Sequence, residues 1–290
     1  MTPTDKASVL IEALPYLQKF SGSTFLIKMG GSCMEDPELV APLMRDIVFL
    51  KVAGIHPIVV HGGGKRISAA MERAGIEAEF VNGLRVTSDK AIEIVEETLG
   101  SVVNAEIVEH INDSGGKAAP ILGTDVFMAK RVQAKDEDGS LVDIGRVGAV
   151  EKCVVEDILY SISSKIIPVV TPLGRENDSG EALNINADLA AAALAKALKV
   201  RKLVYISDVP GLLRDFKDPE SLIESVDRSQ ARELIKQGVI SGGMVPKVES
   251  AVDAIDAGVR KVHFIDGRIP HTLLLEIFTS EGIGTEIVTA

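Results

Sequence analysis

The sequence has 290 residues, of which 46% are apolar and 25% are charged, and its formal net charge is −11. This composition is typical of a globular protein with enough apolar residues for a sizeable core. The negative charge, the three Tyr and the absence of Trp disfavour a nucleic-acid surface, which needs a basic stripe and stacking rings. No uncharged apolar run approaches the ~20 residues of a membrane helix, and "MTPTDKASVL" lacks the layout of a signal peptide, so we expect a cytoplasmic protein that binds no membrane.

The cysteines and histidines do not indicate a metal site. Cys33 and Cys153 are far apart and lack CxxC spacing, which disfavours a disulfide framework and a zinc site. The five histidines are scattered, and none pairs at metal-ligand spacing with another. We therefore expect no protein-bound metal.

Residues 7–20, "ASVLIEALPYLQKF", place apolar side chains at roughly helical spacing, with a kink expected at Pro15. Two interpretations are open. The segment is either a helix folded onto the domain or an arm that packs on another subunit, and the pattern alone favours the first.

Short Val/Ile/Leu runs then alternate with helical periodicities. Continuous apolar strands between helices are typical of a mainly parallel sheet buried on both faces, so the sequence predicts an α/β fold. Helices are expected at 37–54 and 186–199, and residues 126–145 predict a hairpin around Asp138-Gly139. No low-complexity linker divides the chain, so two lobes would share a sheet or a close junction. The expected strands cover residues 24–29, 57–60, 165–170, 202–207 and 261–265.

Glycine or charge follows several of these strands, at the edge where open α/β sheets bind ligands. "FLIKMGGS" places Lys28 before Gly30 and Gly31 without the Walker spacing. Alone this is weak evidence, because a lysine at a strand end is usually solvated. "VVHGGGKRI" runs from a strand into Gly62–Gly64 and a helix, which favours an anion-binding turn over a merely close turn.

Two later segments also end near glycines. "SGGMVPKVESAVDAIDAG" predicts a helix with Pro246 at its first position and Lys247 in its first turn. A lysine there opposes the helix dipole, so it either neighbours an anion or extends into solvent. In "ISDVPGLL", Pro210-Gly211 fit a type II turn, and Asp208 either caps a turn or lies near a ligand.

Further polar residues lack an obvious local duty. Arg85 in "NGLRVTS" lies between apolar neighbours, where a guanidinium suits a carboxylate. "ALNINADLA" places Asn184, Asn186 and Asp188 around a helix start, and a cap explains one or two of these three.

In chain order, "IKMGG", "VVHGGG", "NGLRVT", "LNINAD", "KLVYISDVPGLL" and "GGMVPK" resemble the amino-acid kinase family, and within it the acetylglutamate kinases of arginine biosynthesis. The resemblance covers nearly the whole chain. It implies ATP-dependent phosphorylation of the γ-carboxylate of N-acetyl-L-glutamate, with Mg²⁺ held mainly by the nucleotide. The implied fold is an open, eight-stranded, mainly parallel sheet with an oligomerisation helix (1–22), a lobe for acetylglutamate (23–195) and a lobe for ATP (196–290).

The resemblance also implies roles for individual residues. Lys28 and Lys247 would stabilise the transferring phosphoryl group, and Asp188 would hold both lysines. Acetylglutamate would be bound by Gly63, Gly64, Arg85 and Asn184. ATP would be bound by Gly30, Gly31, Asp208, Gly211, Leu213, Gly242, Gly243 and Met244.

Some residues depart from the family pattern. Met29 stands where many relatives have an aromatic residue, and Ser32-Cys33 replace a common Asn-Ala. The stretch 122–129, "LGTDVFMA", lacks the Ser-Gly-Lys-Asp of many relatives, so Thr124 and Asp125 are assigned no role. The phosphate-handling set is unaffected.

The termini resemble the arginine-inhibited, hexameric branch of the family, in which N-terminal helices interlace dimers into a ring. That resemblance reverses the first interpretation of residues 7–20 and favours an oligomer arm. L-Arginine would bind as an inhibitor between this helix and the C-terminal segment, at Glu281, Gly282 and Gly284. Whether a nitrogen-regulatory signalling protein docks on the hexamer stays open.

Three alternative functions are compatible with parts of this pattern. Another carboxylate kinase of the same family would share these motifs. A Rossmann dehydrogenase is disfavoured, because "HGGGKR" is not GxGxxG and no acidic residue ends a strand about 20 residues on. A non-catalytic amino-acid sensor on this scaffold is disfavoured by Lys28, Lys247 and Asp188, since a sensor does not need to hold a phosphoryl group.

Overall fold

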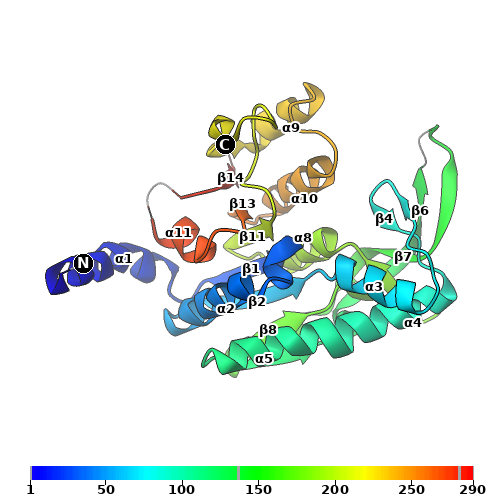
Figure 1. Ribbon diagram of the computed structural model, residues 1–290, viewed down its shortest axis with the longest axis horizontal. Coiled ribbons are helices and arrows are strands. Elements are labelled where there is room, and N and C mark those ends of the chain that lie inside the picture. Colours follow the sequence, from blue (N-terminus) through cyan, green and yellow to red (C-terminus); the bar gives the residue numbers. More distant parts are fainter. Residues whose placement is uncertain (1, 136–137, 280–281, 290) are drawn as a thin grey trace.

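The computed structural model of the protein describes residues 2–135, 138–279 and 282–289. Within these ranges an eight-stranded sheet forms the centre of the molecule (Figure 1). All neighbouring strands run parallel except the pair β13 and β14, which confirms the predicted mainly parallel α/β sheet. In spatial order the strands are β12 (Ser225–Asp227), β14 (Thr285–Val288), β13 (Lys261–Asp266), β11 (Lys202–Ser207), β1 (Thr24–Met29), β2 (His56–His61), β8 (Ile167–Val170) and β5 (Ala118–Ile121).

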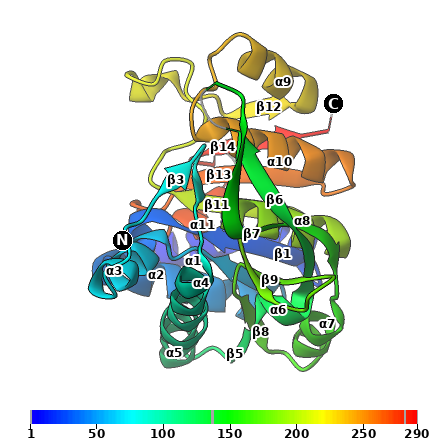
Figure 2. The same cartoon turned by 90° about the vertical axis from the view of Figure 1, so that its right-hand side faces the viewer.

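Helices cover both faces of the sheet (Figure 2). Because side chains alternate along a strand, each strand contributes to two separate cores. Leu26 of β1 packs in one core, and its neighbours Phe25 and Ile27 pack in the other. The first core is covered by α7 (Glu156–Ser163), α8 (Ala187–Leu198), α9 (Arg228–Lys236) and α10 (Met244–Asp256), and the second by α1 (Pro3–Phe20), α2 (Pro37–Val52), α5 (Ala105–Asp113) and α11 (Thr272–Phe278).

Two smaller units flank the sheet. The predicted hairpin is confirmed as antiparallel β6 and β7, and these strands close into a four-stranded barrel with β9 and β10. A short hairpin, β3 and β4, lies beside it and leads through α4 and the π-helical η2 into α5. The bounds are β6 (Phe127–Lys135), β7 (Leu141–Cys153), β9 (Leu173–Glu176), β10 (Ala182–Ile185), β3 (Phe80–Val81), β4 (Leu84–Arg85), α3 (Gly64–Arg73), α4 (Asp89–Glu96), η2 (Glu97–Asn104), α6 (Gly123–Val126), η1 (Gly31–Met34) and η3 (Pro219–Ser221).

The N-terminal helix α1 extends away from the sheet (Figure 1). Its last turns pack on the body, where Tyr16 meets Phe278 edge-on with ring centroids 6.5 Å apart. Its first half presents apolar side chains to solvent, since Val9, Leu10 and Ile11 are 53–70% exposed. None of the helices in the described ranges is long and apolar enough to cross a membrane.

Some predicted boundaries shift by a few residues. Helix α2 ends at Val52, and Gly54 follows with φ +85°. Helix α10 begins at Met244, so Pro246 is its third residue and not its first. Pro is still tolerated there, because the first four N–H groups of a helix have no intrahelical partner. The predicted lobe boundary at 195/196 falls inside α8, and the division into lobes stays a prediction.

Candidate active site

Strands β1 and β11 are neighbours, and the chain continues from β1 to β2 on one side of this pair and from β11 to β12, β13 and β14 on the other side. Such a switch point is where open α/β sheets bind ligands. Lys28, the fifth residue of β1, shares a face with Leu26 and therefore points toward α8 and α10. It is only 7% exposed, so solvent does not account for its charge.

A carboxylate joins Lys28 to Lys247. Asp188, the second residue of α8, places Oδ1 2.9 Å from Lys28 Nζ, and its Oδ2 pairs with Lys247 Nζ from the first turns of α10. All three side chains are largely buried, with exposed fractions between 9% and 22%. We call Lys28, Asp188 and Lys247 the lysine–aspartate cluster.

The cluster carries a net positive charge near the sheet edge. Burial acts to raise the pKa of Asp188, but the charges and hydrogen bonds of Lys28 and Lys247 outweigh it and lower that pKa below its ordinary value. Burial lowers the pKa of Lys247, and Asp188 opposes this effect. One carboxylate therefore neutralises only one of two buried ammonium groups, which leaves the cluster able to attract a further anion.

Two glycine turns adjoin the cluster. A Cβ atom on Gly30 would collide with Lys28 Nζ, and one on Gly31 (φ +79°) would lie 2.5 Å from Asp208 Oδ1. The second turn is joined to the first, because Gly62 N donates to Met29 O at 2.8 Å. Gly63 precedes α3 without a side-chain cap, so N–H groups of the first turn are available to an anion.

A pocket lined by the β3–β4 hairpin and the start of α8 is here called the Arg85 pocket. Arg85 is 7% exposed and donates to Gly64 O at 2.8 Å and to Ser68 Oγ at 2.9 Å. Within the described ranges it forms no ion pair with a carboxylate. The lining includes the predicted Gly63, Gly64, Arg85 and Asn184, with Asn186 and Ala187 just before Asp188.

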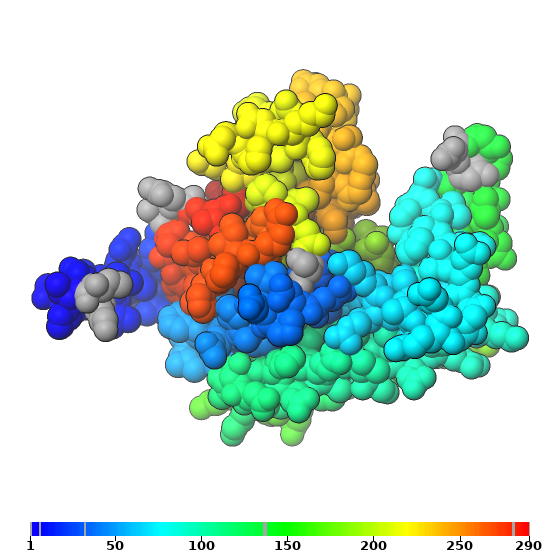
Figure 3. Space-filling model, viewed as in Figure 1, coloured from blue at the N-terminus to red at the C-terminus, as the bar shows by residue number. Residues whose placement is uncertain are grey.

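A second pocket, formed by the C-terminal elements and including Met244 of α10, is here called the Asp208 pocket. Four predicted residues line it, namely Asp208, Gly211, Leu213 and Met244. Gly242 and Gly243 do not line it, although their neighbours Ser241 and Met244 do. Gly30 and Gly31 do not line it either; Gly30 lies against Lys28 and Gly31 lies against Asp208. The surface is hollowed between these C-terminal elements and the cyan and green hairpins (Figure 3).

A third pocket lies apart from the cluster, between α1 and the C-terminal segment, and is here called the Glu276 pocket. Lys202 Nζ is 2.9 Å from His263 Nε2, and His263 Nδ1 is 2.5 Å from Glu276 Oε1. Glu276 Oε2 accepts from the backbone N–H of Ile283 at 2.9 Å and of Gly284 at 3.1 Å. Gly282 and Gly284 line this pocket together with Tyr16, Lys19 and Phe20, whereas Glu281 lies outside the described residues.

The structure adds residues that the sequence did not indicate. Tyr205 OH donates to Asp188 O at 3.2 Å and lies 3.1 Å from Ser250 Oγ, which ties the start of α8 to α10. His61 lies behind the glycine turn, 2.7 Å from Gly62 O, and burial lowers its pKa to about 4. The position of Tyr205 in a buried strand could have indicated a polar contact in the sequence, because a buried Tyr hydroxyl needs a hydrogen-bond partner.

The structure also distinguishes the two asparagines before Asp188. Asn186 caps α8, whereas Asn184 Nδ2 donates to Thr87 Oγ1 at 3.1 Å.

The segment that departs from the family pattern has a local structural duty. Arg175 donates to Thr124 O at 3.0 Å and pairs with Asp125 Oδ1 at 2.8 Å. The side chains of Arg175 and Asp125 are about half exposed, so this pair lies at the surface.

A parallel α/β sheet that gathers two lysines, a carboxylate and two glycine turns at one edge is typical of proteins that bind phosphorylated ligands. The sequence model of the amino acid kinase family matches residues 23–266. The chain belongs to the amino acid kinase family.

Relatives within this family share most of the chain. An acetylglutamate kinase of Akkermansia muciniphila is 58% identical over 284 residues, which are 98% of this chain and 96% of the relative. One of Heliobacterium modesticaldum is 47% identical over 290 residues, covering 98% of each. Among solved structures, an N-acetylglutamate synthase of Neisseria gonorrhoeae, complexed with coenzyme A and N-acetyl-glutamate, matches with a TM-score of 0.85 and 25% identity; the match covers 98% of this chain and 63% of the synthase.

Proposed function

We propose that the protein catalyses the ATP-dependent phosphorylation of the γ-carboxylate of N-acetyl-L-glutamate, the second step of arginine biosynthesis. Support comes from acetylglutamate kinases that are 46–58% identical over nearly the full chain. The observation that carries the proposal is the lysine–aspartate cluster, in which Asp188 joins two buried lysines; Asp188 follows Ala187 of the Arg85 pocket, and Lys247 lies on the same helix as Met244 of the Asp208 pocket.

The reaction brings two anions together, because the acceptor carboxylate attacks a phosphate. Lys28 and Lys247 supply positive charge where the phosphoryl group passes between the pockets, and Asp188 keeps both ammonium groups in place. No general base is needed, since the γ-carboxylate is already ionised at neutral pH. The side chains therefore act by charge and by positioning.

The two pockets provide the positioning. In the Arg85 pocket, the guanidinium and the N-terminus of α3 offer donors to a carboxylate, and Asn184 offers an amide. The Asp208 pocket would hold the nucleotide, with Gly30 and Gly31 leaving room for phosphate beside Lys28. The roles of the individual residues, including Gly242 and Gly243, remain part of this proposal.

Mg²⁺ would enter with ATP and neutralise charge on its phosphates. It is commonly held by substrate phosphates, waters and one or two carboxylates, and the carboxylate of Asp208 at the Asp208 pocket fits that donor set. Asp266 also lines this pocket, but both of its carboxylate oxygens accept from Arg268. Within the described ranges no group of three His, Cys, Asp or Glu side chains could hold a metal ion.

An assay of ADP release with four acceptors tests the proposal. We expect turnover with N-acetyl-L-glutamate and little with glutamate, aspartate or carbamate. Equal or faster turnover with one of the other acceptors would favour another carboxylate kinase of the family. No turnover with any acceptor, in a folded protein that binds acetylglutamate, would favour a sensor.

The finer properties are proposed on the same basis. We propose that L-arginine inhibits by binding in the Glu276 pocket, where the carboxylate of Glu224 offers a partner for a guanidinium. Glu276 and Glu286 line the same pocket and are paired with His263 and Lys261. The exposed apolar half of α1 supports an arm that joins dimers into a hexamer in the cytoplasm. Light scattering, and the same ADP assay with arginine, measure both properties.

A further inference from the structure

The two polar side chains of the Arg85 pocket are connected through one buried residue. Thr87 is fully buried, and its Oγ1 donates to Arg85 O at 2.9 Å while it accepts from Asn184 Nδ2 at 3.1 Å. Thr87 therefore links β4, which carries Arg85, to β10, which carries Asn184. Any shift of Thr87 changes how these two side chains face the pocket.

The backbone of Thr87 is fixed by strand β7. Thr87 N donates to Ile144 O at 2.9 Å, and Arg146 N donates to Thr87 O at 2.6 Å. Gly145, between them, has φ +72°, and a Cβ atom there would collide with Thr87 O. Val147, the residue after Arg146, pairs with Asn184 in the barrel. Strand β7 therefore contacts both Thr87 and the strand that carries Asn184.

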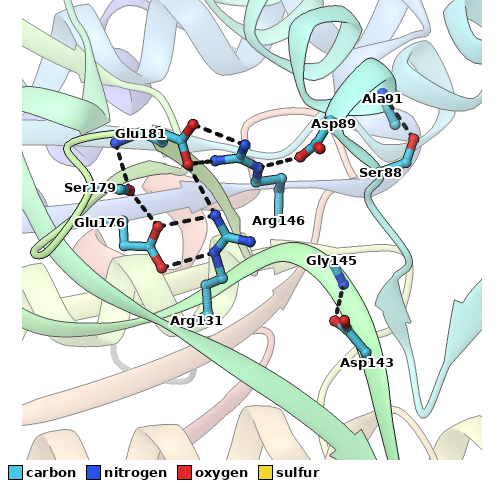
Figure 4. Close-up of polar contacts among 10 residues, drawn as sticks. All are labelled: Ser88, Asp89, Ala91, Arg131, Asp143, Gly145, Arg146, Glu176, Ser179 and Glu181. Atoms are coloured by element: carbon cyan, nitrogen blue, oxygen red, sulfur yellow. Dashed lines mark hydrogen bonds and ion pairs between the residues drawn. The ribbon is translucent and has the colours of Figure 1, made fainter.

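The side chain of Arg146 adds a second pair of links (Figure 4). Its Nε donates to Asp89 Oδ1 at 2.6 Å, in the first turn of α4 and two residues after Thr87. Its two Nη atoms donate to the two carboxylate oxygens of Glu181, just before β10 and three residues before Asn184. The Arg146 side chain is only 14% exposed, whereas Asp89 is 81% exposed and Glu181 is 47% exposed.

A neighbouring arginine makes part of the same network but not this connection. Arg131 donates to Glu176 at 2.8 and 3.1 Å and to Glu181 at 3.1 Å. These partners lie at the end of β9 and just before β10, so the side chain of Arg131 does not link α4 to the barrel. Arg131 is therefore a matched control for the charge of the network.

We infer that Arg146 is a positioning residue that fixes Arg85 and Asn184 relative to each other, and so sets the affinity of the Arg85 pocket for its carboxylate substrate. Ion pairs with solvated carboxylates contribute little to stability. A gain in stability alone therefore does not explain why the guanidinium of Arg146 donates to three carboxylate oxygens, one of Asp89 and two of Glu181. A planar guanidinium that donates to several carboxylate oxygens fixes the relative position of the segments that carry them, and the single ammonium group of a lysine cannot do so. This inference rests on the proposed function.

Replacement of Arg146 tests the inference through separate kinetic constants. For Arg146→Met we expect KM for acetylglutamate to rise about tenfold, because a small misplacement of binding groups is costly, while kcat and KM for ATP stay within about twofold. Arg146→Lys should not restore KM, and Arg131→Met should leave all three constants within about twofold. An unchanged KM in Arg146→Met, or an equal rise in Arg131→Met, would overturn the inference.

A second variant covers a failure of Arg146→Met to fold. Asp89 is 81% exposed, so Asp89→Asn should fold. It should raise KM for acetylglutamate about threefold. If Asp89 acts through Arg146, the double variant should have the same KM as Arg146→Met alone. An unchanged KM in Asp89→Asn would overturn the inference. Absence of acetylglutamate-dependent ADP release in the wild type would instead contradict the proposed function.

Discussion

Replacing Asp188 by Asn removes one negative charge from the lysine–aspartate cluster and changes little else. Asn has nearly the same shape, so no cavity forms, but Lys28 and Lys247 then face each other without a counter-charge. Two unit charges 2.9 Å apart attract by about 6 kcal/mol at the effective dielectric constant of ~20 that suits such sites. Desolvation offsets part of this attraction, and breaking a buried pair typically costs about 3–5 kcal/mol.

That loss has two measurable consequences. At roughly 2–4 °C per kcal/mol for a chain of this size, Asp188→Asn should melt about 10 °C below the wild type. Because the lysines lose their fixed positions, kcat should fall by roughly two orders of magnitude. The lowered pKa of Asp188 means that its stabilisation is present above about pH 4, the ordinary carboxyl range, and is lost as pH falls further. An assay at pH 7 therefore measures the full effect.

The assay combines thermal unfolding with ADP release. Asp125→Asn is the matched control, because it removes the same charge from an exposed pair with Arg175 and should change stability by less than about 1 kcal/mol. A wild-type melting temperature and a wild-type kcat in Asp188→Asn would refute the reasoning about the cluster.

Three further predictions concern other parts of the molecule. Arg85→Lys should raise KM for acetylglutamate about tenfold with a smaller change in kcat, since a point charge cannot replace a planar fork; an unchanged KM would remove Arg85 from the site. In the folded protein His61 has a pKa of about 4, whereas in the unfolded chain its pKa is about 6.5. The unfolded chain therefore takes up a proton first as the pH falls. The contribution of neutral His61 to stability is complete above pH 6.5 and is lost as the pH falls toward 4. Urea unfolding should show the wild type losing about 3 kcal/mol more than His61→Asn between pH 7 and pH 4, and parallel pH profiles would contradict this. Deleting residues 1–20 should reduce particle size in light scattering and arginine sensitivity while sparing turnover, and an unchanged particle would refute the arm.

Much of the fold could be predicted because it follows from local patterns. β1 and β11 lie on the residues expected from "TFLIKM" and "KLVYIS", since continuous apolar runs mark strands buried on both faces. The antiparallel pairing around Asp138-Gly139 followed from turn chemistry and alternation. The closure of β6 and β7 with β9 and β10 could not be predicted, because it depends on pairing between strands far apart in the sequence.

The site was less accessible to sequence reasoning alone. Residue types indicated that Lys28 and Lys247 needed an explanation, but not that one carboxylate joins them; that expectation came from the family resemblance. "ALNINADLA" left open which residue caps the helix, and the structure assigns the cap to Asn186 and frees Asp188 for the lysines. Thr87 and Arg146 gave no signal, because their importance lies in contacts between distant segments.

The central claim is that the lysine–aspartate cluster stabilises the transferring phosphoryl group and does not bind the acceptor. Lys28→Ala tests it most directly, by comparing kcat with the equilibrium affinity for acetylglutamate in the same preparation. We predict that kcat falls by roughly two to three orders of magnitude while the dissociation constant for acetylglutamate changes less than about threefold. Equal losses in kcat and in affinity would contradict the claim.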